Sequence, residues 1–200
     1  MVTIGRWCRV VGAVAALTAA AGHAGAQTWT GTFSGAAEAP PTPSPGTGTA
    51  IVTLAGTNLT VNFTWSGLLS PTAVSHIHCC ALPGNAAGVA TMLPSFVGFP
   101  VGVTAGTYIN TFDLLLASTY NPAFITANGG TVQGAMTALV NGLNAGMAYG
   151  NIHTAQFPGG EIRANLTLVP EPASMLLLGS GLAGLGGAAA RKRRAARKTA

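Results

Sequence analysis

Three histidines are the side chains in this sequence best suited to binding a metal ion. His76 and His78 stand two apart in the segment His-Ile-His-Cys-Cys, and His153 follows an isoleucine in a second apolar segment. If the first segment is a strand, residues two apart share a face, so His76, His78 and Cys80 project together while Ile77 faces the core. Pairing of the two segments would bring three imidazoles and one thiol toward one ion. Such a ligand set suits zinc or copper.

The same pattern also has a purely structural interpretation. Histidines on strands hydrogen-bond to backbone carbonyls or to neighbouring carboxylates, and the sequence alone identifies no such partner for any of the three. The pattern by itself therefore favours framework histidines, with metal binding as the alternative hypothesis.

Cys79 and Cys80 are adjacent, and an export signal at the N-terminus would place them in an oxidising compartment. Cys8 lies inside that signal, so the pair has only each other or an external partner. Three states are compatible with the sequence: a disulfide between the two, ligation of a metal by Cys80, or an intermolecular disulfide. Neighbours on a strand point apart, but Ala81-Leu82-Pro83-Gly84 indicates that the strand ends here. We therefore favour the Cys79–Cys80 disulfide.

Acid–base catalysis has few candidate residues. Charged residues make up 6% of the chain, and the acids between positions 27 and 169 are Glu38, Asp113 and Glu161. Glu161 and Arg163 share a face of the last expected strand, where an exposed ion pair would contribute little stability. The sequence contains no G-x-S-x-G, P-loop or H-E-x-x-H motif. We predict a protein without enzymatic activity and with no catalytic residues.

The basic residues lie at the two ends of the chain. The formal net charge is +5, but Arg6 and Arg9 lie in the first 26 residues and six further bases lie in the last ten. Between positions 27 and 169 the single base is Arg163. One cation cannot neutralise several phosphates, so nucleic-acid binding is excluded.

Residues 27–168 are expected to form one all-β domain, a Greek-key-like sandwich or barrel. This region is rich in Thr, Val, Gly and Asn and has turn residues at short intervals. The expected strands are 28–36, 47–54, 59–65, 73–80, 106–115, 147–154 and 161–168. One inserted helix, capped by Thr131, is expected to cover an end of the domain. Its apolar side chains recur at helical spacing: Val132, Met136, Leu139, Val140 and Leu143.

Residues 1–26 are typical of a secretory signal peptide. Arg6 and Arg9 precede the apolar run 10–21, and Ala24-Gly25-Ala26 provides small residues for signal peptidase. We expect cleavage between Ala26 and Gln27.

The C-terminal segment 169–200 combines three features in order. The motif Val169-Pro170-Glu171-Pro172 is followed by the apolar segment 173–190, an expected transmembrane helix, and by the basic tail 191–198. This arrangement resembles the PEP-CTERM sorting domain of Gram-negative bacteria. The resemblance implies an exosortase that cuts near the motif, a transient anchor in the inner membrane, and delivery to the cell surface or extracellular polymer.

Residues 28–168 carry a second resemblance. Glu38-Ala-Pro40-Pro41, the segment leading to His76-Ile77-His78, and Asn151-Ile-His153-Thr154 followed by Pro158-Gly-Gly-Glu-Ile-Arg163 are similar to the CHRD domain. The resemblance implies a secreted β-sandwich module for which no activity is established. Cys79-Cys80 departs from the family pattern, which more often has a glycine-containing turn after the histidines.

Two classes of function are compatible with these observations. The first, which the sequence favours, is a non-enzymatic surface or matrix protein that acts through binding or structure, with an unknown surface or polymer partner. The alternative is a secreted zinc- or copper-binding β-sandwich, locally similar to copper/zinc superoxide dismutases. The further histidines and the aspartate of those enzymes have no counterpart here, which favours metal binding without turnover.

Overall fold

The computed structural model describes residues 26–170 and residue 181, and the fold is described for these. The expected signal peptide, the transmembrane segment 173–190 and the basic tail lie outside the described residues. Eight strands are present: β1 Gln27–Ser34, β2 Thr47–Ala55, β3 Asn58–Ser66, β4 Thr72–Cys79, β5 Gly106–Asp113, β6 Ala148–Thr154, β7 Ile162–Asn165 and β8 Thr167–Leu168. The helices are α1 Pro122–Ala127 and α2 Val132–Asn144, with short 3-10 turns at Gly35–Ala37 and Ala117–Thr119.

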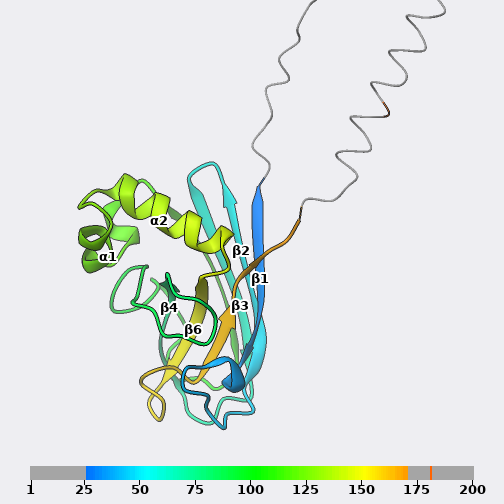
Figure 1. Cartoon of the computed structure of the whole chain (residues 1–200). Helices are drawn as coiled ribbons and strands as arrows, with labels where there is room; N and C mark the ends of the chain where they lie inside the picture. The colour runs from blue at the N-terminus through cyan, green and yellow to red at the C-terminus, as the bar shows by residue number, and fades with distance from the viewer. Residues whose placement is uncertain (1–25, 171–180, 182–200) are drawn as a thin grey trace, which may run out of the picture.

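The strands form one continuous, curled antiparallel sheet (Figure 1). Its order is β4-β6-β7-β1-β2-β3-β5, and β8 pairs with β1. The chain crosses from β3 to β4 at the opposite edge and then returns to β5. Segment 80–105 follows the free edge of β4, where Ala90 N donates to Ile77 O and Phe96 N donates to Ser75 O. This segment covers an edge that would otherwise expose unpaired backbone groups.

The apolar core lies on the concave side of the sheet. On β3 the side chains alternate, with Leu59, Val61, Phe63 and Trp65 buried and the residues between them more exposed. The ring of Phe63 contacts Phe33 and Phe96 edge to face, with centroids 5.0 and 6.1 Å apart. Burial of alternate side chains therefore determines which face of each strand points inward.

Helix α2 lies at one end of the sheet with α1 beside it (Figure 1). The Thr131 hydroxyl accepts a hydrogen bond from Gly134 N at 3.0 Å, which caps the first turn as expected. Leu139 and Leu143 are fully buried, and the other apolar residues predicted for this face are partly buried. The helix thus covers one end of the core.

Each expected strand is present, with boundaries that differ by at most two residues. The last expected strand is interrupted at Leu166, a buried residue that lies between β7 and β8 in the chain. Among the described residues, no helix combines the length and the apolar character that crossing a membrane requires.

Strand β6 is buried along its whole length, and one of its two faces carries residues of the candidate site. Ile152 faces the apolar core, and Gly150 packs so closely on the Phe63 ring that a Cβ atom would lie 2.7 Å from it. The alternate residues face the other side of the sheet, where they meet side chains of β4 and β7. We call this group the polar layer: His76, His78, Tyr149, Asn151, His153 and Arg163.

Candidate metal centre

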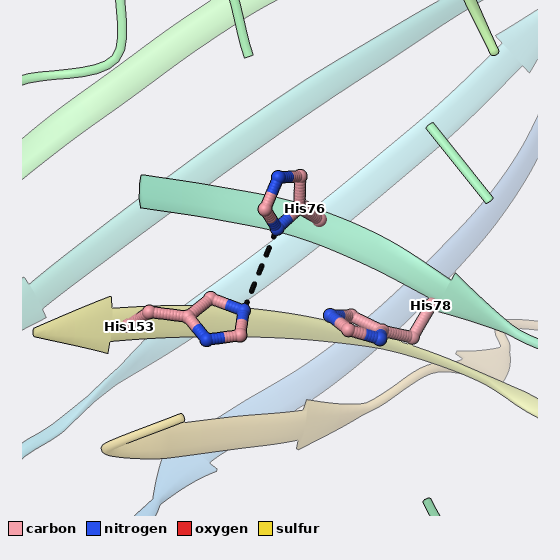
Figure 2. A group of neighbouring side chains, drawn as sticks. All are labelled: His76, His78 and His153. Atoms are coloured by element: carbon pink, nitrogen blue, oxygen red, sulfur yellow. Dashed lines mark hydrogen bonds between the residues drawn. The ribbon is translucent and has the colours of Figure 1, made fainter. Parts of the chain in front are cut away.

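The structure brings the three predicted histidines together. His76 and His78 project from β4, and His153 projects from the neighbouring strand β6, where it pairs with Val74. One ring nitrogen of each lies within 4.8 Å of the other two (Figure 2). All three are more than nine-tenths buried, because loops close over this face of the sheet. The shared phase of the strands therefore produces a compact imidazole cluster.

The outer nitrogen of each ring hydrogen-bonds to a backbone carbonyl. The three contacts are His76 Nε2 to Pro94 O at 2.7 Å, His78 Nδ1 to Ala87 O at 2.9 Å, and His153 Nδ1 to Pro158 O at 2.9 Å. A carbonyl oxygen only accepts, so each of these nitrogens must carry the hydrogen. The second nitrogen of each neutral ring then carries a lone pair, and these lone pairs face the centre of the cluster. Outer partners of this kind orient histidine ligands around metals.

The three imidazoles are neutral at pH 7. Burial lowers the pKa of His76 and of His78 to about 4, and it also lowers the pKa of His153. His76 Nδ1 and His153 Nε2 lie 3.4 Å apart, yet in the neutral rings neither atom carries a hydrogen to donate. His78 Nε2 is buried with no hydrogen-bond partner. Buried hydrogen-bond acceptors without a donor are unfavourable. A bound cation would accept the lone pairs of all three nitrogens.

The spacing of the nitrogens suits one ion. Two nitrogens bound to the same ion at about 2.0–2.1 Å lie roughly 3.3–3.6 Å apart in tetrahedral or trigonal geometry. The separation of 3.4 Å between His76 Nδ1 and His153 Nε2 falls in this range. The third nitrogen, on His78, lies within 4.8 Å of these two. Within residues 26–170, no acidic side chain joins the group.

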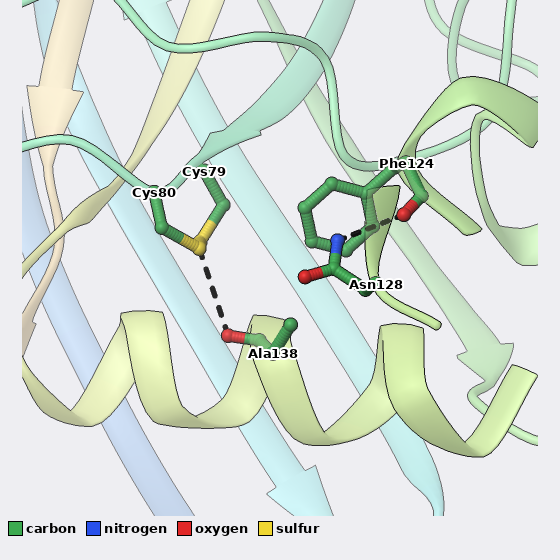
Figure 3. Close-up of a disulfide and its surroundings, with 5 residues drawn as sticks. All are labelled: Cys79, Cys80, Phe124, Asn128 and Ala138. Carbon is green, nitrogen blue, oxygen red and sulfur yellow. Dashed lines mark hydrogen bonds between the residues drawn. A yellow bond between two sulfur atoms is a disulfide. The ribbon is translucent and has the colours of Figure 1, made fainter. Parts of the chain in front are cut away.

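Cys80 lies outside the cluster, which corrects the expected four-ligand set. The strand ends at Cys79, so the alternation that would align Cys80 with the histidines does not continue. Cys79 and Cys80 are joined by a disulfide, and Cys80 Sγ lies 3.6 Å from Ala138 O on α2 (Figure 3). A disulfide sulfur supplies no thiolate. The candidate site therefore consists of three imidazoles.

We expect Gly142→Ala to destabilise the protein by about 1–3 kcal/mol through overpacking. Alanine usually stabilises a helix relative to glycine, but a Cβ atom at Gly142 would overlap Cys79 Sγ and lie 2.7 Å from Cys80 Sγ. Chemical denaturation measures the change. The same substitution in a Cys79→Ala/Cys80→Ala background is the control and should cost less. A stabilising effect in the oxidised protein would contradict this packing.

Tyr149 and Arg163 form a stacked column beside His78. The rings of His78 and Tyr149 are parallel within 6°, with centroids 4.9 Å apart. The guanidinium carbon of Arg163 lies 3.5 Å from the Tyr149 centroid, while Nε donates to Asn165 Oδ1 and Nη1 donates to Asn85 O. Tyr149 and Asn151 were not predicted as site residues, although their period-two spacing with His153 places all three on one face of a strand.

Glu161 and Arg163 do not form the expected ion pair at an exposed edge. Both are buried, and the described region contains no ion pair between them. The Glu161 carboxylate instead accepts hydrogen bonds from Ser44 Oγ, Leu69 N and Thr154 Oγ1 at 2.6, 2.6 and 2.7 Å. These hydrogen bonds connect the loops that contain Ser44 and Leu69 to Thr154 at the end of β6.

We expect Glu161→Gln to lower the free energy of unfolding by about 1–3 kcal/mol. The amide replaces one acceptor oxygen with a donor, which leaves a buried hydrogen-bond donor unpaired. Urea denaturation tests this, with Asp113→Asn as a matched control because Asp113 Oδ1 accepts from Leu115 N in a more exposed place. Equal effects of the two substitutions would refute the structural role of Glu161.

Glu38 contacts the polar layer through Asn151. Asn151 Nδ2 donates to both of its carboxylate oxygens, at 3.0 and 3.1 Å. Burial raises the pKa of Glu38 to about 7. At neutral pH this carboxyl group is therefore only partly ionised.

The curled antiparallel sheet and its buried histidine cluster define an all-β module. The chain belongs to the CHRD domain family, whose model matches residues 29–166. The PEP-CTERM protein-sorting motif matches residues 168–194, so this is an extracellular protein sorted by an exosortase. Neither model describes an enzyme family. No curated protein matches the chain. No solved structure matches it.

Proposed function

We propose that this protein is a non-enzymatic, extracellular metal-binding module in which His76, His78 and His153 hold one zinc or copper ion. The observation that carries this proposal is the convergence of three ring nitrogens whose lone pairs have no donor. A framework role explains the nitrogen that bonds to a carbonyl, but it gives no partner to the second nitrogen of each ring. Here one nitrogen of each ring is bonded to a carbonyl, and the other is directed at a shared centre.

The proposal includes the route by which the domain reaches its place. Signal peptidase removes residues 1–26, and the segment 173–190 anchors the chain in the inner membrane until an exosortase acts near Val169-Pro170-Glu171-Pro172. The domain 27–168 is then delivered to the cell surface or extracellular polymer. The match to the sorting motif supports this order of events.

Binding without turnover fits the surroundings of the histidines. No acidic side chain of the described region joins the cluster, and the three rings are buried beneath loops. A group that moves protons at pH 7 needs a pKa near that value, whereas His76 and His78 titrate at about 4. The arrangement supports storage or display of an ion rather than acid–base catalysis.

Thermal unfolding of the full chain, purified without a histidine tag, tests the proposal. An ion that binds the folded state at a thousand times its Kd stabilises that state by about 4 kcal/mol. We expect stabilisation of this size with zinc or copper, and the same stabilisation in a Cys79→Ala/Cys80→Ala variant. The absence of stabilisation by either metal would refute the proposal. Loss of the stabilisation in the cysteine variant would also refute it, because the metal would then bind at the cysteines and not at the histidines.

A further inference from the structure

We infer that the ion this site prefers is copper(I), and that the site discriminates against divalent zinc. The inference rests on the proposed function, because it concerns the same three histidines.

The ligand set carries no negative charge. A histidine that binds a metal is a neutral ring, and the hydrogen bond of each ring to a carbonyl fixes which nitrogen carries the hydrogen. The only cysteines of the described region are joined in a disulfide and supply no thiolate. A bound ion therefore keeps its full charge in a buried place. The cost of removing an ion from water grows with the square of its charge. A divalent ion is thus penalised about four times as much as a monovalent ion in this continuum picture.

Arg163 adds a positive charge behind the cluster. Because β6 lies between β4 and β7, His78 and Arg163 approach the Tyr149 ring from opposite sides. The charge of Arg163 therefore produces a positive field at the His78 ring, which stacks on the same tyrosine. The same field repels a bound metal ion, and it acts on a divalent ion with twice the energy that it has on a monovalent one.

Glu38, the acid that contacts the polar layer, does not provide a full counter-charge. Glu38 contacts the polar layer through Asn151, which donates to both carboxylate oxygens. Its pKa of about 7 leaves the group half protonated near neutral pH. The charges around the site therefore disfavour zinc.

The number of ligands points in the same direction. Zinc takes a fourth ligand, from the protein in structural sites or from water in catalytic ones, whereas this buried cluster supplies three. Imidazole is a good ligand for copper, and copper(I) is stable with three donors. A site of three neutral imidazoles beside a cation is suited to a monovalent ion of this kind.

Competition titrations against colorimetric chelators test the inference. The full chain, without a histidine tag, is titrated anaerobically with copper(I) and separately with zinc(II). We expect the Kd of copper(I) to be at least about a hundredfold lower than the Kd of zinc(II). Zinc affinity equal to or greater than copper(I) affinity would overturn the inference while leaving metal binding intact. Binding of neither ion would overturn the proposed function as well.

Substitution of Arg163 separates its charge from its packing. Arg163→Gln should raise zinc affinity about tenfold and copper(I) affinity about threefold, since the repulsion of a divalent ion is twice as large. Arg163→Lys gives up the stacking on Tyr149 but keeps the charge. Because the charge sets the repulsion, both affinities should stay within about twofold. Equal changes for the two ions, or the same change in both variants, would overturn the role of the charge. If Arg163→Gln fails to fold, the titrations of the unaltered chain still decide the preference.

Discussion

Acidification from about pH 6.5 to about pH 4 should destabilise the metal-free protein by several kcal/mol. In the unfolded chain His76 and His78 titrate near 6.5, whereas burial lowers their pKa to about 4 in the folded protein. Between these values the unfolded state binds more protons, so stability falls as the pH falls. Each of these histidines contributes up to about 1.4 kcal/mol per pH unit. The lowered pKa of His153 acts in the same direction.

Glu38 acts with the opposite sign and must be separated from the histidines. Its pKa rises from 4.5 to about 7 on folding, so the folded state binds more protons and gains stability as the pH falls through this range. A variant with His76, His78 and His153 all changed to Gln retains Glu38. Urea denaturation of both metal-free proteins at pH 7 and pH 5 therefore isolates the histidines. An equally steep pH dependence in the variant would contradict the account.

Loss of any one imidazole should lower metal affinity by about a hundredfold or more. Three ligands hold the ion, and even loss of an outer hydrogen-bond partner typically costs 10–100-fold in affinity. His76→Gln, His78→Gln and His153→Gln are therefore expected to have similar, large effects in a metal titration at pH 7.

Ser75→Ala is the matched control for these substitutions. Ser75 is buried on β4 beside His76, but its side chain donates to Asn151 O instead of joining the cluster. Its removal should reduce stability without changing metal affinity by more than about threefold. A large loss of affinity in Ser75→Ala, or an unchanged affinity in one histidine variant, would show that the ligand set is misassigned.

The period-two pattern of the strands predicted much of this arrangement. Leu59, Val61, Phe63 and Trp65 identified a core face, and Ile77 did the same for β4. Because Ile77 points inward, His76 and His78 had to share the other face. Ile152 gave His153 the same orientation on β6.

Other features depend on contacts between segments far apart in the sequence. The carbonyls of Pro94, Ala87 and Pro158 belong to loops, so the orientation of the imidazoles could not be predicted. The same holds for Glu161, whose partner Ser44 is 117 residues away. Cys80 lies in the disulfide that the sequence favoured. The alternative role as a fourth ligand fails because it extends the strand pattern beyond the end of β4.

The metal content of the exported protein tests the central claim most directly. The full chain is purified without a histidine tag, supplied with zinc or copper, dialysed and examined by mass spectrometry, beside a His76→Ala/His78→Ala/His153→Ala variant. We predict about one ion per chain in the unaltered protein and none in a variant that still unfolds cooperatively. A chain that retains no metal, or a variant that retains as much as the unaltered protein, would contradict the account and leave the histidines as framework residues.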